Sequence, residues 1–385
     1  MSFRTYKMED VLDSIIDYRG KTPQKSDEGI MTLSAKSVRD GYIDYSQCYF
    51  ISREEYDRFM VRGFPQIGDV LMTTEAPLGV TARLERDDVA LAQRLLTLRG
   101  KAEILDTGYL YYYLRSPIGQ AKLRARQTGT TVTGIKQAEF RKIEIDLPSI
   151  GIQRKTASVL EAVDKKIAIN KEINENLRQQ AGAVFDIFYE ETPNQQPFTS
   201  LINVLGGGTP KTGNPDFWDG PIPFFTPKDV GAPYTFQTEK YITESGLDHC
   251  NSRLYQKDTT FVTARGTVGK VSLAGTPMAM NQSCYALASE TVDPLLVYFY
   301  TLKAVASLKH KASGAVFDAI VTRDFDSETI NILSDDDSKL VLSIIKPIMD
   351  AIHKYSEENM RLAALRDSLL PKLMSGELDV SDLDL

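Results

Sequence analysis

The sequence predicts an α+β protein with two similar α/β domains separated by two long helices, which form an antiparallel coiled coil and give the chain a pseudo-two-fold internal repeat. Three observations predict this fold. Landmarks recur in the same order in both halves of the chain, each half mixes short β-type runs with helical runs, and each half ends in an apolar stripe of helical spacing. The length of 385 residues agrees, since one domain takes about 150 residues.

Short motifs in the first half return 185 to 190 residues later. No single match is informative, but several in one order indicate a duplicated frame with divergent loops. The matching residues are Pro23 with Pro210, Gly79 with Gly269, Gln93 with Gln282, Gly129 with Gly314, and Phe140 with Phe325. The segment IEIDLPS at 143–149 likewise corresponds to INILSDD at 330–336.

Each repeat begins with about 140 residues of mixed β and helical character, which is a common domain size. Helices are expected around 107–127 and 293–311. Strands are expected at 49–51, 69–72, 79–84, 95–98, 259–263, 269–273 and 285–287. We therefore divide the chain into a first domain at 1–146, a first long helix at 147–192, a second domain at 193–334 and a second long helix at 335–385.

Apolar residues at alternating spacings of three and four predict the two long helices to pair as a coiled coil, in which a buried Asn fixes the register. Residues 153–188 would span about 54 Å as a helix, so the pair could act as a spacer. Two domains held apart by such a spacer could at most address DNA sites roughly 16 base pairs apart, at 3.4 Å per base pair. The interface residues expected are Leu160, Val163, Ile167, Asn170, Leu177, Val184, Ile345, Ile348, Ile352, Asn359, Leu362 and Leu369.

The apolar stripe continues onto flanking positions, among them Ile152, Ile173, Ile344 and Leu365, and is wider than a two-stranded seam needs. This width favours a further helical partner. An alternative is that the stripe packs on the chain's own domains.

Composition excludes several classes of protein. No apolar run approaches the 18 residues of a membrane span, and the acidic first turns do not resemble a signal peptide, so we expect a cytoplasmic protein. Three cysteines without a CxxC motif and three isolated histidines give no disulfide framework, zinc site or catalytic triad. The Gly-Lys-Thr at 20–22 lacks the upstream glycine of a phosphate-binding loop, because residue 15 is Ile15. We expect no catalytic residues and no bound metal.

Nucleic-acid binding is better supported, although the net charge is −7. Much of the acidity lies in 335–385, whereas 115–142 holds seven basic residues and one acid, Glu139. Such a patch can neutralise phosphates, although a solvated helix face would have the same composition. The DNA-binding candidates are Lys36, Arg39, Arg124, Arg126, Thr128, Thr130, Lys136, Lys228, Arg265, Lys309, Lys311 and Ser313. The tyrosines at 109 and 111–113 have near-helical spacing and are expected in a core.

Three stretches resemble one known family. The segment LPSIGIQRKTASVLEAVDKKIAINKEINENLRQQAGAVF resembles the central conserved region of specificity subunits of type I restriction–modification enzymes. The segment RLAALRDSLLPKLMSGEL resembles their C-terminal conserved region, and GGGTPKTGNPDFWDGPIPFFTPKDV resembles the start of their second target recognition domain. The resemblance covers essentially the whole chain. One departure is the acidic Ser334–Asp337 junction, which lacks the proline of Leu147-Pro148-Ser149 and leaves the entry of the second helix in question.

The resemblance implies a non-catalytic subunit that recognises a split, asymmetric target in double-stranded DNA, with one half-site per domain. It implies that the helices set the spacing and bind two methyltransferase subunits, which carry S-adenosylmethionine and methylate adenine. Restriction subunits that use ATP and Mg²⁺ would join the larger complex, and this chain would hold no cofactor and contact no membrane. The alternatives are a coiled-coil assembly scaffold without sequence-specific DNA binding and a stand-alone methyltransferase or nuclease, for which the sequence shows no motif.

Overall fold

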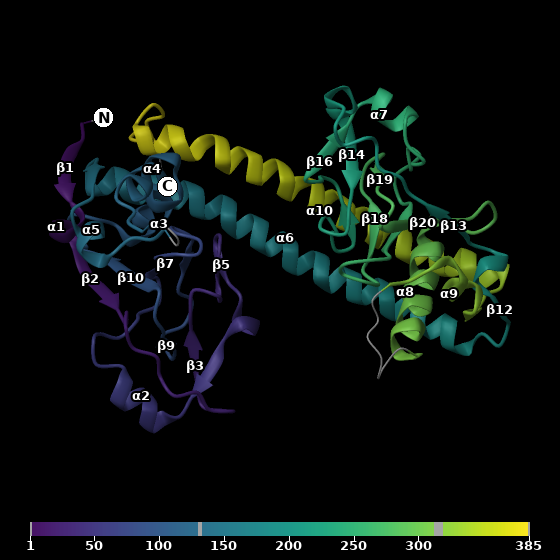
Figure 1. The fold of residues 1–385 in the computed structure, drawn as a ribbon, viewed down its shortest axis with the longest axis horizontal. Helices are drawn as coiled ribbons and strands as arrows, with labels where there is room; N and C mark the ends of the chain where they lie inside the picture. The colour runs from purple at the N-terminus through teal and green to yellow at the C-terminus, as the bar shows by residue number, and fades with distance from the viewer. Residues whose placement is uncertain (1, 130–132, 312–318, 384–385) are drawn as a thin grey trace. The chain divides into compact units, whose positions relative to one another are not determined.

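The computed structural model describes residues 2–129, 133–311 and 319–383, and the chain forms two compact units (Figure 1). Unit 1 contains residues 1–167 and 362–385, and unit 2 contains residues 168–361. Each unit therefore consists of one α/β domain together with part of both long helices. The predicted fold class, two similar α/β domains and two long helices, is confirmed.

In unit 1, a four-stranded antiparallel sheet of order β2-β10-β7-β8 lies beside a three-stranded sheet of order β6-β3-β9. The strands are β1 (Arg4–Lys7), β2 (Leu12–Asp17), β3 (Ile30–Leu33), β4 (Val38–Arg39), β5 (Tyr42–Ile43), β6 (Tyr49–Ile51), β7 (Val70–Thr73), β8 (Thr81–Arg83), β9 (Ala90–Leu91), β10 (Leu95–Gly100) and β11 (Glu144–Leu147). The helices are α1 (Met8–Val11), α2 (Arg53–Phe59), α3 (Thr107–Arg115), α4 (Pro117–Ala125) and α5 (Gln137–Arg141).

In unit 2, a five-stranded sheet of order β13-β20-β17-β18-β15 accompanies a three-stranded sheet of order β16-β14-β19. The strands are β12 (Gln195–Pro197), β13 (Asn203–Gly206), β14 (Trp218–Phe225), β15 (Tyr234–Thr235), β16 (Lys240–Ile242), β17 (Thr260–Thr263), β18 (Val271–Ala274), β19 (Ala279–Met280), β20 (Cys284–Ala288) and β21 (Thr329–Asn331). The helices are α7 (Glu244–Asp248), α8 (Pro294–Lys311) and α9 (Thr322–Asp326).

The two domains share one topology, which confirms the internal repeat. Order β2-β10-β7-β8 corresponds to β13-β20-β17-β18, and order β6-β3-β9 corresponds to β16-β14-β19. Even the mixed pairing is repeated, because β3 pairs parallel with β9 and β14 pairs parallel with β19. The end strands also match, since β1 pairs with β11 and β12 pairs with β21. Among the described residues, the β4–β5 pair has no matching strand pair in unit 2, and the β15–β18 pair has none in unit 1.

The long helices are α6 (Ile150–Glu191) and α10 (Asp335–Ser375). Within unit 2 they pair antiparallel through a buried polar layer. The Asn170 side chain, which is 0% exposed, donates to Glu358 Oε2 at 2.9 Å and to Asn359 Oδ1 at 3.0 Å. Asn174 donates to Ser356 Oγ at 3.0 Å. Amides buried between apolar helix faces lose hydrogen bonds when the helices slide, so this layer fixes the register.

The acidic junction before α10 supplies an N-cap of its own. Ser334 Oγ accepts a hydrogen bond from the Asp337 N–H at 3.1 Å, which makes it the N-cap. The three aspartates of the first turn place negative charge at the positive end of the helix dipole. The Ser334 cap and the acidic first turn therefore start α10 at a junction that lacks the proline found before α6.

One helix prediction needs correction. The helix expected at 107–127 is two helices, because Ser116 ends α3 and its hydroxyl caps α4 by accepting from Gly119 N–H, with Pro117 at the first position. The wide apolar stripe packs in part on the chain's own domains, whereas its flanking residues Ile344 and Leu365 are exposed, so a further helical partner stays a prediction. In unit 2, Phe185 of α6 stacks on Phe299 of α8 at 5.1 Å between ring centroids, and in unit 1 Leu160 packs in the core of the domain. The alternative, packing on the chain's own domains, accounts for much of the stripe.

Candidate nucleic-acid interface

The same loop closes the β7–β8 hairpin of unit 1 and the β17–β18 hairpin of unit 2. In unit 1, Thr73 Oγ1 donates to the Pro77 carbonyl at 2.5 Å and accepts from the Val80 N–H at 3.0 Å. In unit 2, Thr263 Oγ1 donates to the Thr267 carbonyl and accepts from the Lys270 N–H at 2.9 Å. A threonine hydroxyl thus satisfies both a donor and an acceptor of each loop.

A glycine and a long polar side chain fix the base of each hairpin loop. Gly79 and Gly269 have φ values of +82° and +70°, in the region that favours glycine. Gln120 Nε2 of α4 donates to the Gly79 carbonyl at 2.9 Å, and Lys309 Nζ of α8 donates to the Gly269 carbonyl at 2.6 Å. Both contacts connect a helix, α4 or α8, to the hairpin loop. Lys309 therefore holds the loop of unit 2 as Gln120 holds the loop of unit 1.

A second loop follows the central strand of each small sheet and places a lysine on the surface. In unit 1 the Ser37 N–H donates to the Ser34 carbonyl at 2.9 Å, and in unit 2 the Asp229 N–H donates to the Thr226 carbonyl at 2.9 Å. These turns expose Lys36 and Lys228. Lys36 makes no ion pair with a described residue, and Lys228 Nζ lies 3.4 Å from Glu239 Oε2 on an exposed side chain.

The second loop, which we name the lysine loop, lies beside the hairpin loop in each unit. In unit 1 they line one cleft of about 430 Å³, whose residues include Lys36, Arg39, Glu75, Pro77 and Arg94. In unit 2 the Thr267 hydroxyl donates to the Pro227 carbonyl at 3.2 Å, which joins the same two loops.

A third segment packs against the hairpin loop in both units. The Ile135 N–H donates to the Thr74 carbonyl, and the Ile320 N–H donates to the Ala264 carbonyl, both at 2.9 Å. Glu75 forms an isolated bridge with Gly134, and Arg265 forms one with Ala319. We name the three segments of each unit its loop cluster. The loop cluster of unit 1 comprises the described residues of 34–40, 75–79 and 128–135, and the loop cluster of unit 2 comprises those of 226–232, 265–269 and 319–321.

A model for the type I restriction modification DNA specificity domain matches residues 3–179 and again residues 197–360. The chain belongs to this family. The specificity subunit of the type I restriction enzyme MjaIX of Methanocaldococcus jannaschii is 22% identical over 349 residues, which cover 84% of this chain and 80% of that protein. The specificity subunit of EcoR124I/EcoR124II of Escherichia coli is 28% identical over 176 residues, which cover 42% and 43% of the two chains.

The fold is also found in a solved structure, that of the S subunit of a type I restriction–modification system from M. genitalium. It covers 97% of this chain and 96% of its own, with a TM-score of 0.60 and 15% sequence identity. This likeness shows the fold of a specificity subunit.

The loop cluster of each unit contains predicted DNA-binding residues of this specificity subunit. Lys36, Arg39 and Thr128 belong to it in unit 1, and Lys228 and Arg265 in unit 2. Arg39 lies 3.5 Å from Asp44 in an ion pair that leaves 43% of its side chain exposed. Thr130 and Ser313 lie outside the described residues.

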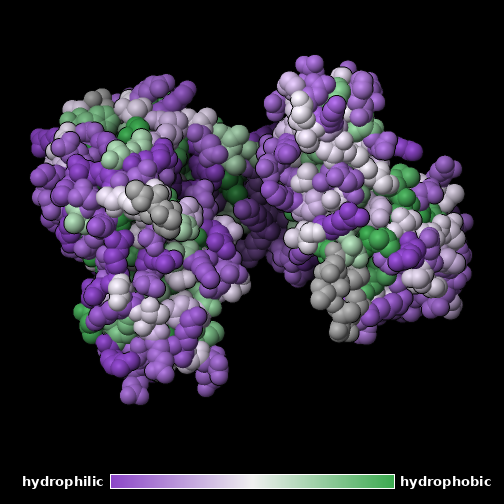
Figure 2. Space-filling model, viewed as in Figure 1, coloured by the Kyte–Doolittle hydropathy of each residue, from purple (hydrophilic) through white to green (hydrophobic). Residues whose placement is uncertain are grey.

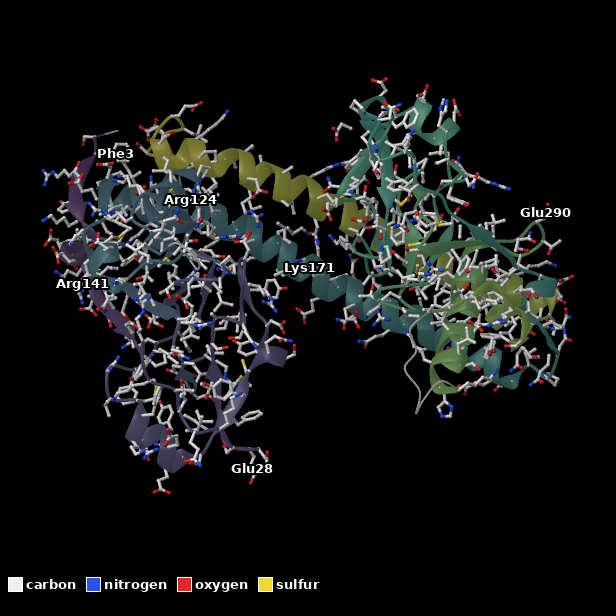
Figure 3. The ribbon with its side chains drawn as sticks, viewed as in Figure 1. Phe3, Glu28, Arg124, Arg141, Lys171 and Glu290 are labelled. Atoms are coloured by element: carbon white, nitrogen blue, oxygen red, sulfur yellow. The ribbon has the colours of Figure 1, made fainter. Side chains whose placement is uncertain are left out.

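The predicted basic residues beside the cluster differ in their partners. Lys136 is exposed just before α5, and Arg124 is exposed on α4 (Figure 3). Neither makes an ion pair with a described residue. Arg126 shares Glu139 with Lys142, and these two cations hold the pKa of the Glu139 carboxyl below its usual value, with Lys142 making the larger contribution. Arg124 and Lys136 are thus better placed than Arg126 to bind an external anion.

Two of the predicted DNA-binding lysines serve the fold of unit 2. Lys309 holds the Gly269 carbonyl, and its partial burial lowers the pKa of its ammonium group. Lys311 Nζ lies 2.6 Å from Oε1 of Glu328, a residue that is 1% exposed. Both lysines are therefore not included in the proposed DNA interface.

The residues predicted for the helix interface are buried or half-buried within the chain. Leu160, Asn170, Ile345 and Ile352 are each 0% exposed, while Leu177, Ile348 and Leu369 pack at the margins of the cores. Val163, Ile167, Val184, Asn359 and Leu362 are half-buried. The long helices instead expose Ile169, Ile187, Leu340, Ile344 and Leu365, at between 40% and 59%. Of these, Ile344 and Leu365 were among the predicted flanking positions.

Sequence analysis missed Glu75 and Arg94, which line the cleft of unit 1. Arg94 Nε lies 2.8 Å from Glu75 Oε1. The repeat spacing was a usable signal, because the offset of 190 residues that pairs Gly79 with Gly269 also pairs Glu75 with Arg265. The tyrosines at 109 and 111–113 are at most 4% exposed, which confirms their predicted place in a core.

Other kinds of site are not seen in the described part of the chain. Residues 2–129, 133–311 and 319–383 contain no group of three His, Cys, Asp or Glu side chains arranged to hold a metal ion. None of the described helices is both long enough and apolar enough to span a membrane. The face of each unit shown in Figure 2 is mainly hydrophilic, with scattered hydrophobic residues.

We predict that Lys311→Met destabilises unit 2 by about 1 to 2 kcal/mol, because it leaves the Glu328 carboxylate buried without its cation; the cost is limited because the lysine is partly exposed. Urea unfolding measures this change. Lys228→Ala, which removes an exposed lysine, is the matched control and should change stability by less than about 0.5 kcal/mol. Equal stability of Lys311→Met and the unmodified protein would contradict the structural role of this pair.

Proposed function

We propose that this chain is the DNA specificity subunit of a type I restriction–modification complex, and that its domains at 1–146 and 193–334 each recognise one half of a split target in double-stranded DNA. The observation that carries the proposal is the loop cluster built twice on one topology. A subunit that recognises two unlike half-sites needs a common frame, which holds the loops, and different side chains within those loops.

The chemistry of the loop cluster suits DNA. The lysine turn presents Lys36 in one domain and Lys228 in the other, and an exposed lysine neutralises backbone phosphate. Each phosphate contact would contribute about 0.9 to the slope of log affinity against log salt concentration. Base recognition would then fall to Arg39 and Thr128 in the first domain and to Arg265 in the second. Thr130 and Ser313, which lie outside the described residues, are proposed as further DNA contacts. Arg124, Arg126 and Lys136 supply further positive charge.

The proposed task of the helices is to join the two domains and to bind two methyltransferase subunits. In this proposal 147–192 and 335–385 are the conserved helical regions, and their length sets the spacing of the half-sites. The seam residues hold α6 to α10, so the exposed apolar residues Ile169, Ile187, Leu340, Ile344 and Leu365 are the better candidates for contact with a partner. Exposed apolar side chains that repeat along a helix are typical of an interface.

The chemistry of the complex is proposed to reside on its partners. Methyltransferase subunits would supply S-adenosylmethionine and adenine methylation, and restriction subunits would supply ATP-driven translocation and Mg²⁺-dependent cleavage. This chain would contribute recognition alone.

The direct test of the proposed function is sequencing that detects methylated adenine on DNA from cells that carry this chain with its methyltransferase partner. We predict modified adenine in one split motif, with two specified halves around a fixed gap. Cells that carry the methyltransferase without this chain are the control and should show no such motif. Modification without sequence preference would favour the alternative of an assembly scaffold.

Docking can be tested by placing a charge on the exposed helix face. We predict that Ile344→Asp reduces co-purification of the methyltransferase subunit at least about tenfold, since a carboxylate in an apolar contact must be desolvated. Ser343→Asp introduces the same charge one residue earlier on α10 and should leave co-purification unchanged. Equal recovery of the partner with both variants would place the contact elsewhere on this chain.

A further inference from the structure

One position in the loop cluster carries opposite charges in the two domains. Glu75 and Arg265 both lie two residues after the end of the first hairpin strand, and both form an isolated bridge with the third loop segment. The preceding residues, Thr74 and Ala264, both receive a hydrogen bond from the backbone N–H of that segment. The backbone contacts therefore place Glu75 and Arg265 at equivalent points of the same loop.

The surroundings of the two side chains also differ. Glu75 has 27% of its side chain exposed, and its Oε1 lies 2.8 Å from Arg94 Nε. Arg265 is exposed and makes no ion pair with any described residue of its unit. The residue of unit 2 that corresponds to Arg94 is Ser283, because the carbonyls of Arg94 and Ser283 accept equivalent hydrogen bonds, from Thr74 N–H at 3.0 Å and from Ala264 N–H at 2.8 Å.

Binding to a backbone phosphate does not explain why this position carries opposite charges in the two domains. The DNA backbone carries the same negative charge at every nucleotide, so residues that bind it should have the same sign in both domains. Lys36 and Lys228 satisfy this condition, because both are cations on equivalent turns. A carboxylate at Glu75 would repel phosphate. This position holds an acidic residue in one domain and a basic residue in the other, on equivalent backbone. Such a position is suited to recognise the edges of nucleobases, whose hydrogen-bonding groups differ between base pairs.

We propose that Glu75 and Arg265 are specificity-determining residues, each for one base of its own half-site; this rests on the proposed function of the chain. The Arg265 guanidinium donates two hydrogen bonds to O6 and N7 of a guanine. The Glu75 carboxylate accepts from an exocyclic amino group, N6 of adenine or N4 of cytosine. Arg94 is a positioning residue, which holds one carboxylate oxygen and leaves lone pairs of the other available to the base.

The test compares the methylated motif of the full chain with its methyltransferase partner before and after single substitutions. For the unmodified chain we expect adenine or cytosine at one position of one half-site, and guanine at one position of the other. Glu75→Gln should relax the first position, and Arg265→Gln the second. In each case the discrimination against other bases should fall about tenfold or more at that position, while the other half-site stays unchanged.

Matched controls replace exposed residues of the same kind outside the loop cluster. Glu28 lies at the end of unit 1 opposite Arg124 (Figure 3), and Glu28→Gln should leave the motif unchanged. Arg253→Gln should do the same in unit 2. Arg265→Lys keeps the charge but loses the planar pair of donors, and it should relax the same position as Arg265→Gln.

The outcomes separate this inference from the function on which it rests. A split motif that stays the same in Glu75→Gln and Arg265→Gln would overturn the assignment and leave the proposed function intact. Weaker methylation of every site with unchanged base preference would also overturn it, because it would indicate a phosphate or packing role. The lack of any motif with the unmodified chain would instead overturn the proposed function itself.

Discussion

One hydrogen bond in each domain connects the helix that packs on the sheet to the loop that the sheet exposes. Gln120 makes it in unit 1 and Lys309 in unit 2, and in both cases the acceptor is the carbonyl of a glycine with positive φ. This contact fixes the end of the hairpin loop, and the threonine hydroxyl at the end of the first strand fixes its middle. The side chains between these points can then differ while the same hydrogen bonds hold the loop, which is the condition for two recognition surfaces on one frame.

The long helices satisfy a different constraint, because they must pack on the domains and on each other. In unit 2, Phe185, Ile345 and Ile352 are fully buried in a core shared with α8. In unit 1, Leu160, Leu370 and Leu373 lie in the core of the first domain. Each domain is thereby held to its own stretch of both helices. The polar layer around Asn170 costs hydration of buried amides and in return specifies which residues face each other.

The repeat, the fold class and the two helices could be predicted because they depend on periodic patterns and on the order of landmarks. Helix breaks depend on single capping residues, so the break at Ser116 was missed inside a helical pattern. Asn170 and Asn359 could be identified as residues of the helix seam, where they form a hydrogen bond, since amides in an apolar stripe have few other roles. The roles of Lys309 and Lys311 could not, because a lysine that binds a carbonyl or a buried carboxylate has the same sequence context as one that binds phosphate.

The two loop clusters are proposed to contact different halves of one DNA target. Photo-cross-linking tests this proposal most directly, with a benzoylphenylalanine introduced at Lys36 or at Lys228 in the complex with the methyltransferase and a duplex that carries the methylated motif. A third chain with the group at Lys165, exposed on α6, is the control. We predict that the group at Lys36 labels one half-site and the group at Lys228 labels the other. Labelling of the same half-site from both positions would contradict the account, as would labelling from Lys165 alone.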